Sequence, residues 1–311
     1  MNFSYPYFDA HCDTITELYK NKSSLNNSKY MVNLSHLKKY FGAVQVFAIY
    51  NSGSLFKENI ISILEFLKEE CKLYNEFISF ETTEKPMLQN HLANKITAFA
   101  SIESLGSQKD FSPNHISFYK QKGVKIMSLC HNADNPLCGG CALNQNGLTP
   151  LGRESLRLMQ KTSVILDVSH MSHKSFWEAI AEYSLPFMAT HSNSSKIHNH
   201  PRNLTDEQFI CLAKRGGVCG INYYPPHLGK KANIETVIKH IEHFMSLGGE
   251  NAICLGSDFD GIEKTAQNLE NAGCVYRLFN KLLSINYNET LINKIAFNNF
   301  HNFLKNYETL A

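Results

Sequence analysis

Residues 5–13 read YPYFDAHCD, a short apolar stretch that ends in a polar triplet, and seven further apolar runs follow along the chain. The runs are rich in strand-forming residues, and most of them are separated by segments with helical patterns. Runs of this kind are typical of strands buried in a parallel sheet. The eight predicted strands are Tyr5–Ala10, Ala43–Tyr50, Ile96–Ile102, Val124–Leu129, Ser163–Val168, Phe187–Thr190, Val218–Asn222 and Ala252–Gly256.

Helices are predicted between most of these strands and after the last one. They cover Lys57–Phe80, Thr149–Lys161, His173–Tyr183, Thr205–Arg215, Asn233–Leu247 and Glu289–Asn306. Thr205 and Gln208 form a capping-box pattern, which indicates a helix start. Eight strands alternating with helices predict an α/β fold of the (β/α)8 TIM-barrel type, with a doubly wound open sheet as the alternative. No Gly/Pro/Ser-rich linker or charge block divides the chain, so residues 1–311 are interpreted as one domain.

Side chains that could bind metal ions or transfer protons stand at or just after the ends of six predicted strands. They are His11, Asp13, Glu103, His131, His170, His191 and Asp258. In a (β/α)8 barrel the C-terminal ends of the strands share one rim, and active sites lie on that rim. The sequence therefore predicts that these side chains meet.

The pattern favours a metal centre over a set of unrelated polar residues. His11 and Asp13 lie on the same face of an extended segment, because side chains on a strand alternate. Imidazole and carboxylate suit Zn²⁺ or another borderline divalent ion. His170 and His191 bring the terminal ligands to four, although each alone is more typical of a core or surface histidine. Glu103 could bridge two ions with its two oxygens, or could simply be an acid at a helix start.

Three other features are weighed beside this centre. Asp258 lies in the stretch Gly256–Gly261, which lacks the ligand spacing and terminal glutamate of an EF-hand, so Asp258 is interpreted as a base, an acid or a ligand. Asp167 is more consistent with a partner of a ligand or a buried hydrogen-bond acceptor. Cys138 and Cys141 have no second pair to complete a zinc ribbon, so they are interpreted as thiols in a flexible loop.

The composition argues against several classes of partner. The net charge is +2 without a dense basic patch, which argues against nucleic-acid binding. The first ten residues do not resemble a secretory signal, and no charge-free apolar run is long enough to span a bilayer. The nine cysteines are scattered and are interpreted as reduced thiols. These features predict a cytoplasmic protein without a membrane partner.

Several stretches together resemble the renal, or membrane, dipeptidase family of zinc peptidases. They run from residue 8 to about residue 261 in the order that the family shows, whereas the loop around Cys138 and Cys141 departs from the family pattern. The matching stretches are Phe8–Asp13, Gly147–Arg153, Leu166–His170, Thr190–Ser192, His200–Glu207 and Gly256–Gly261.

The resemblance implies a distorted (β/α)8 barrel that binds two zinc ions. His11 and Asp13 would bind the first ion. His170 and His191 would bind the second, and Glu103 would bridge the two.

The resemblance also implies roles for three residues that meet the substrate or move protons. His131 would lie near the substrate carbonyl, where with the zinc it stabilises the oxyanion. Arg202 would bind the C-terminal carboxylate of the substrate; the alternative is a surface arginine paired with Asp206 or Glu207. Asp258 would be the general acid and base.

The implied substrates are dipeptides, with tolerance for a D-residue at the C-terminal position. The chain resembles the soluble, bacterial-type members of the family, and a homodimer is the habit of that family.

Two other functions are compatible with parts of the pattern. Another amidohydrolase, acting on cyclic amides or esters, would often bridge its metals with a carboxylated lysine at the end of the fourth strand. Lys125 stands near the start of that strand, and Glu103 is available instead, so the dipeptidase is favoured. A non-catalytic metal-binding barrel would be expected to lack Asp258 or a ligand, and all of them are present.

Overall fold

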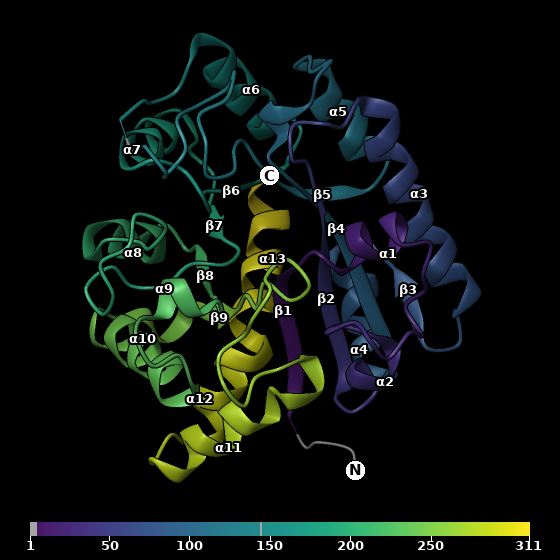
Figure 1. The fold of residues 1–311 in the computed structure, drawn as a ribbon, viewed down its shortest axis with the longest axis vertical. Helices are drawn as coiled ribbons and strands as arrows, with labels where there is room; N and C mark the ends of the chain where they lie inside the picture. The colour runs from purple at the N-terminus through teal and green to yellow at the C-terminus, as the bar shows by residue number, and fades with distance from the viewer. Residues whose placement is uncertain (1–4, 144) are drawn as a thin grey trace.

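Eight parallel strands close into a barrel in the computed structural model, which describes residues 5–143 and 145–311 (Figure 1). The ring closes because β2 pairs with both β1 and β4, and β9 pairs with both β8 and β1. All eight predicted strands are present, so the (β/α)8 barrel is confirmed and the open sheet is wrong. The strands of the ring are β1 (Pro6–Cys12), β2 (Phe41–Tyr50), β4 (Ile96–Glu103), β5 (Val124–Ser128), β6 (Ile165–Asp167), β7 (Met188–Ala189), β8 (Val218–Ile221) and β9 (Ile253–Leu255).

A short strand outside the ring was not expected. The sequence predicts a helix over Lys57–Phe80, but α3 (Lys57–Leu73) is shorter, and β3 (Ile78–Phe80) follows it. β3 pairs with the first half of β4, through Ile78 opposite Ile96, while β5 pairs with the second half. The apolar residues of this segment fit helical spacing equally well, and the exposed edge of β4 decides in favour of a strand.

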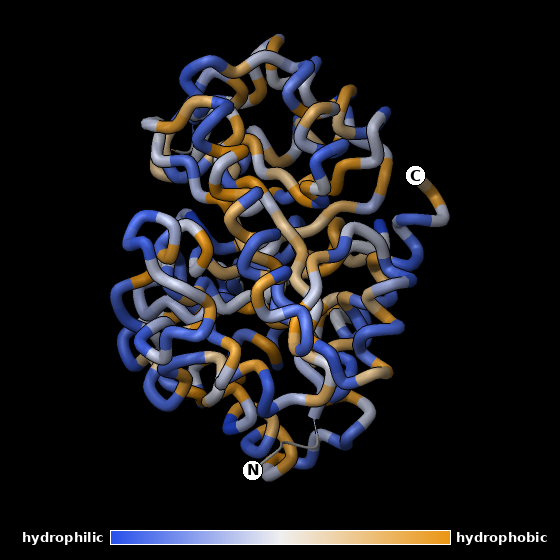
Figure 2. Tube along the Cα trace, turned by 90° about the vertical axis from the view of Figure 1, so that its right-hand side faces the viewer, coloured by the Kyte–Doolittle hydropathy of each residue, from blue (hydrophilic) through white to orange (hydrophobic). Residues whose placement is uncertain are grey.

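The helices lie around the barrel, and their apolar faces pack against it. Figure 2 shows hydrophobic and hydrophilic residues alternating along the outer helices, as expected for helices with one buried face. The capping box of α8 is confirmed, since the Thr205 hydroxyl accepts from the Gln208 N–H and the Gln208 side chain accepts from the Thr205 N–H. The helices close to their predicted positions are α6 (Pro150–Lys161), α7 (His173–Glu182), α8 (Asp206–Lys214) and α10 (Ile234–Ser246). Those outside the predicted ranges are α1 (Thr14–Lys20), α2 (Leu34–Leu37), α4 (Glu84–Leu92), α5 (Asn114–Gln121), α9 (Pro225–Leu228) and α11 (Tyr276–Ser284).

The last helices close the N-terminal end of the barrel. α12 (Glu289–Asn293), a π-helical turn (Lys294–Asn298) and α13 (Asn299–Leu310) follow one another, within and just beyond the predicted range Glu289–Asn306. Phe300 stacks on Phe8 of β1 with ring centroids 4.0 Å apart, inside a core that lines the barrel. The candidate site therefore lies at the opposite end of the barrel, where the strands end.

None of the helices in the described part of the chain has both the length and the apolar character that crossing a bilayer requires.

Candidate active site

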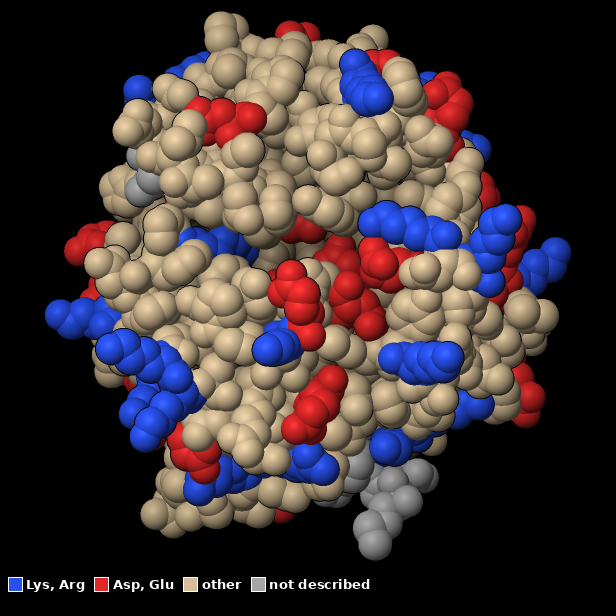
Figure 3. Space-filling view, in the orientation of Figure 1, with Lys and Arg blue, Asp and Glu red and all other residues tan. Residues whose placement is uncertain are grey.

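The seven side chains predicted to meet do lie together at the C-terminal rim of the barrel. Their ligand atoms form three overlapping groups, each within 4.8 Å: His11 with Glu103 and His191, Glu103 with His131 and His170, and His11 with Asp13 and Asp258. They surround a cavity of about 340 Å³, which all of them except His11 line directly. Figure 3 shows acidic side chains gathered around a hollow near the middle of this face.

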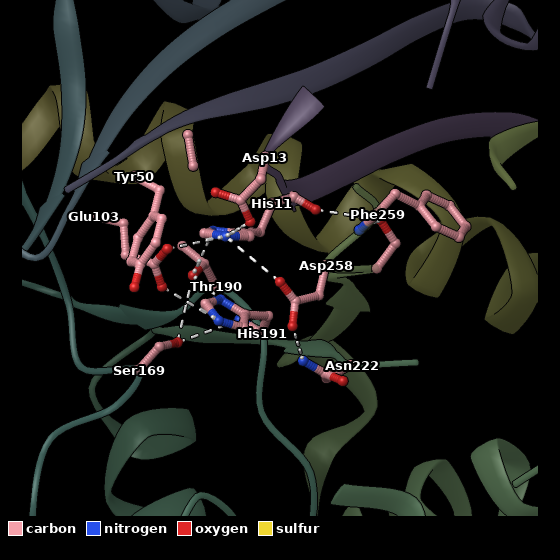
Figure 4. A network of polar contacts seen from close by, with 12 residues as sticks. His11, Asp13, Tyr50, Glu103, Ser169, Thr190, His191, Asn222, Asp258 and Phe259 are labelled. Atoms are coloured by element: carbon pink, nitrogen blue, oxygen red, sulfur yellow. Dashed lines mark hydrogen bonds and ion pairs between the residues drawn. The ribbon is translucent and has the colours of Figure 1, made fainter. Parts of the chain in front are cut away.

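One side of the cavity is formed by the end of β1 and the segment after β9. His11 Nε2 lies 3.5 Å from Asp13 Oδ2, 3.8 Å from Glu103 Oε2 and 3.9 Å from Asp258 Oδ1. Figure 4 shows these carboxylates converging on the imidazole. His11 Nε2 and Asp13 Oδ1 are buried and have no hydrogen-bond partner. Buried polar atoms normally have one, so both fit a bound cation.

The other side is formed by the ends of β6 and β7. His170 Nε2 lies 2.9 Å from Glu103 Oε1, and His191 Nε2 lies 3.6 Å from the same oxygen. The two Nε2 atoms are 2.8 Å apart. Glu103 thus directs one oxygen toward His11 and the other toward the second pair of histidines, as a bridging ligand would.

The backbone bends sharply at these positions. His170 and Asp258 have φ angles of +69° and +65°, and Ser104, directly after Glu103, has +66°. This left-handed region is strained for residues other than glycine, by about 1–3 kcal/mol each. Such strain is often retained at functional sites, and here it occurs where the chain leaves β4, β6 and β9.

The buried acids dominate the electrostatics. Burial alone would lower the pKa of His11, but the carboxylates of Glu103, Asp13 and Asp258 outweigh it and raise that pKa to about 10. Burial raises the pKa of Glu103 well above its usual range and that of Asp258 to about 6. Divalent cations would neutralise this concentration of negative charge. The donor set of imidazoles and carboxylates therefore fits a pair of zinc-like ions.

His131 follows β5 and completes the wall next to His170. The ring centroids of His131 and His170 are 4.2 Å apart, and those of His131 and Tyr50, at the end of β2, are 5.1 Å apart. Burial and then the nearby charge of Arg202 lower the pKa of His131 to about 4, so its ring is neutral at neutral pH. A neutral imidazole in the wall of the cavity can donate one hydrogen bond to a substrate.

Arg202 lies behind the cavity rather than in its wall. It is only 3% exposed, and its guanidinium donates to Ser192 Oγ at 2.8 Å and to the His191 carbonyl at 2.6 Å. It lines a second cavity of about 140 Å³, which shares His170 with the first. The alternative of a surface ion pair is wrong, since Arg202 is buried and Asp206 instead meets His243 at 2.7 Å.

Lys125 does not reach the rim. It is buried on β5 and forms an ion pair with Glu308 of α13, at the closed end of the barrel. A carboxylated lysine bridge from this residue is therefore wrong for this fold.

Tyr50 and Asn222 also line or support the site, and the sequence reading gave neither of them a role. Asn222 donates to Asp258 Oδ2 at 2.9 Å, and Tyr50 lines the main cavity. Both stand at predicted strand ends, so the rule that identified the histidines and acids could have found them.

The Cys138–Cys141 loop is packed against the site rather than free. Both thiols are buried, and the Cys141 N–H donates to the His170 carbonyl at 2.9 Å. The Cys141 thiol donates to Asn132 Oδ1, which also accepts from His170 Nδ1. Within the described residues, no candidate metal group includes a cysteine.

Replacing Cys138 and Cys141 together with serine is expected to leave the metal content and most of the activity unchanged. At position 141 a serine hydroxyl can donate to Asn132 in place of the thiol, and the two cysteines lack the partners of a structural zinc site. Elemental analysis and a rate assay would test this, with Cys71→Ser on α3 as a buried control far from the rim. Loss of a further zinc ion from the double variant would contradict the interpretation.

His240 supports the segment between His191 and Arg202. It is buried on α10, and its Nδ1 accepts the Ser194 N–H at 3.1 Å. Burial is the main cause that lowers its pKa from 6.5 to about 4. Because the folded pKa is depressed, this contribution to stability is complete above pH 6.5 and is lost as the pH falls toward 4.

We therefore expect the free energy of unfolding to fall by up to about 3 kcal/mol over this interval because of His240 alone. Thermal melts of the parent and of His240→Asn between pH 7 and 4 measure the difference, since an asparagine oxygen can accept the same N–H without titrating. Parallel pH profiles for the two proteins would show that His240 is not responsible.

Known proteins with a similar sequence or fold include several peptidases. A family model described as membrane dipeptidase (peptidase family M19) matches residues 2–311. An uncharacterized dipeptidase of Schizosaccharomyces pombe is 29% identical over 255 residues, which are 80% of this chain and 62% of the relative. Dipeptidase tcpJ of Claviceps purpurea is 26% identical, with 80% and 60% covered. The chain thus spans less than two thirds of the length of these relatives.

The fold is also found in a solved metallopeptidase from Rhodobacter sphaeroides, whose structure holds a phosphinate mimic of the dipeptide L-Ala-D-Ala. The TM-score is 0.86 at 18% identity, with 97% of this chain and 99% of that chain covered. Since the family model matches almost the whole sequence, the chain belongs to the membrane dipeptidase family, peptidase family M19.

Proposed function

We propose that this chain is a metal-dependent dipeptidase that hydrolyses the peptide bond of dipeptides, including those with a D-residue at the C-terminal position. The observation that carries the proposal is the position of Glu103, with one carboxylate oxygen toward His11 and the other toward His170 and His191. Membership of the dipeptidase family supports it.

The proposed centre holds two Zn²⁺ ions. His11 and Asp13 would hold one ion, His170 and His191 the other, and Glu103 both. Such a pair of ions supplies a Lewis acid for the carbonyl and lowers the pKa of a water molecule. The partnerless atoms His11 Nε2 and Asp13 Oδ1 support this set of ligands.

Asp258 is proposed as the group that moves protons. Its Oδ2 accepts from Asn222, which orients the carboxylate, and its Oδ1 faces His11 across the cavity. Burial raises its pKa to about 6, close to the value at which a carboxyl group can both take and return a proton near neutral pH. Asp258 would take the proton from the attacking water and deliver it to the leaving amine.

His131 and Arg202 are proposed to bind the substrate. A neutral His131 would donate to the carbonyl oxygen as negative charge develops there. Arg202 uses two of its five N–H groups on Ser192 and His191, and its Nε has no partner. The remaining donors would receive the C-terminal carboxylate of the substrate from the side of the smaller cavity.

The experiment that tests this function compares substrates of defined length. Free dipeptides, with L- or D-alanine at the C-terminus, should be cleaved. Tripeptides and C-terminally amidated dipeptides should be poor substrates, because Arg202 would bind the free carboxylate of the residue directly after the scissile bond. Efficient cleavage of amidated dipeptides by the unmodified protein would show that Arg202 does not set substrate length.

Arg202→Ala is expected to lower kcat/KM for dipeptides roughly 10- to 100-fold, the size of a hydrogen bond to a charged group. The same change should reduce the penalty for amidation. Arg153→Ala on α6 is a control, because Arg153 lines neither cavity and pairs with Glu178 and Glu182.

A further inference from the structure

Thr190 contacts two histidines that belong to opposite sides of the proposed centre. It directly follows β7, is completely buried, and is drawn beside both rings in Figure 4. Its hydroxyl oxygen lies 2.8 Å from His191 Nδ1 and 3.4 Å from His11 Nδ1. The same oxygen lies 2.6 Å from Asp167 Oδ2.

The Thr190 hydroxyl oxygen also lies 3.3 Å from Ser169 Oγ, but its shortest contact, to Asp167 Oδ2, decides where its proton lies. The 2.6 Å separation is that of a hydroxyl donating to a carboxylate, so the single hydroxyl proton of Thr190 belongs to Asp167. The oxygen then has only lone pairs to offer to the two rings. Both His191 and His11 therefore donate from Nδ1–H, which leaves Nε2 as the nitrogen of each ring that can bind a metal ion.

The two Nε2 atoms point into different parts of the site. His11 Nε2 faces Asp13, Glu103 and Asp258, whereas His191 Nε2 faces Glu103 and His170. The remaining histidine ligand does not use Thr190, because His170 Nδ1 meets Asn132 Oδ1 at 2.8 Å.

Asp167 holds Thr190 in this position. Its Oδ1 accepts the backbone N–H groups of Ser169 and Thr190, both at 2.9 Å, and its Oδ2 accepts the Thr190 hydroxyl. The carboxylate thereby fixes both the main chain and the side chain of Thr190 relative to the end of β6. Rotation of the hydroxyl toward either ring would break its bond to Asp167.

We infer that Thr190, held by Asp167, is a shared positioning residue that sets the tautomer and orientation of one histidine ligand for each of the two metal ions. The inference rests on the proposed function, because it needs a centre with two ions. In this role the Thr190 hydroxyl does more than link β6 to β7, because the binding of both ions depends on this one side chain.

Thr190→Val tests this inference, since valine keeps the shape and removes the hydroxyl, while Thr190→Ser restores it. Thr97→Val is the matched control: Thr97 is buried on β4, and its hydroxyl accepts from Asn90 at 3.2 Å and contacts no histidine among the described residues. Zinc affinity at each of the two sites is measured by competition with a chromophoric chelator. We expect about 10- to 100-fold weaker binding at both sites in Thr190→Val, as is typical when a partner of a histidine ligand is removed. Thr190→Ser and Thr97→Val should bind like the parent.

A second measurement uses the unmodified protein and does not depend on how well the variants fold. Long-range ¹H–¹⁵N spectra of the zinc-loaded protein, with ¹⁵N-labelled histidine, should show His11 and His191 protonated at Nδ1, with both protons protected from exchange. Protonation at Nε2 in either ring would overturn the inference. So would unchanged zinc affinity in Thr190→Val, which would indicate a purely structural hydroxyl, or weakening at one site only.

These measurements use no substrate, so they separate the inference from the proposed activity. A protein that binds two ions and hydrolyses no dipeptide would contradict the proposed function and leave the role of Thr190 standing. A parent protein that binds no divalent ion would overturn both.

Discussion

Replacing Asp258 with asparagine is expected to lower the turnover of dipeptides by about 10²- to 10⁴-fold, the usual contribution of a general acid or base. Asparagine keeps the shape of the side chain, and one of its polar atoms can still meet Asn222, so the cavity should be preserved. What is lost is the ability to accept and return a proton. The metal content should remain at the level of the parent protein.

Metal content is the decisive readout, because the geometry offers Asp258 a second role. Its Oδ1 lies 3.9 Å from His11 Nε2, and the two group with Asp13 as a potential set of ligands. Loss of one ion from Asp258→Asn would show that Asp258 is a ligand, and near-normal turnover would show that the acid and base lies elsewhere. Asp206→Asn on α8 is a suitable control, since Asp206 lines neither cavity and its carboxylate pairs with His243.

Glu103→Gln is expected to remove both the activity and part of the metal. The parent protein, prepared without chelator, should contain close to two equivalents of zinc, and the variant should contain fewer. Glutamine has one good acceptor oxygen and no charge, so it cannot serve two cations. Because bound ions contribute several kcal/mol to the transition state, their loss should reduce turnover about 10³-fold or more.

Glu70→Gln is the matched control for this variant. Glu70 is also a buried carboxylate, but it accepts from the Leu25 N–H and the Ser24 hydroxyl, away from the barrel rim. It should lose stability without losing zinc. A parent protein that stays at one equivalent under zinc supplementation, or a Glu103→Gln variant that retains two, would contradict the binuclear centre.

The barrel and its rim could be predicted because both depend on local order along the chain. Alternation on a strand places His11 and Asp13 on one face, and parallel strands bring the C-terminal ends of β1, β4, β5, β6, β7 and β9 to one edge. Seven polar residues at these ends therefore converge. The prediction needed no knowledge of any individual contact.

What the sequence did not predict depends on contacts between distant segments. β3 forms because β4 has an unpaired edge, which no local pattern in Ile78–Phe80 reveals. Arg202 matches the family pattern, yet its bonds to Ser192 and His191 place it behind the cavity. The position of a residue at a strand end predicts that it lies at the rim. The direction in which its guanidinium or hydroxyl points depends on its hydrogen-bond partners, which the sequence does not reveal.

The closure of the barrel by α13 has a consequence for how the chain reaches its folded state. Phe8 is synthesised long before its partners Phe297 and Phe300. Contacts between residues so far apart in sequence form slowly, because the intervening chain must be ordered first. A nascent chain can thus carry every side chain of the proposed metal centre before α13 closes the N-terminal end of its barrel. A chain interrupted before α13 would keep the polar residues of the rim and expose the apolar interior beneath them, so we expect chaperones and proteases to recognise it.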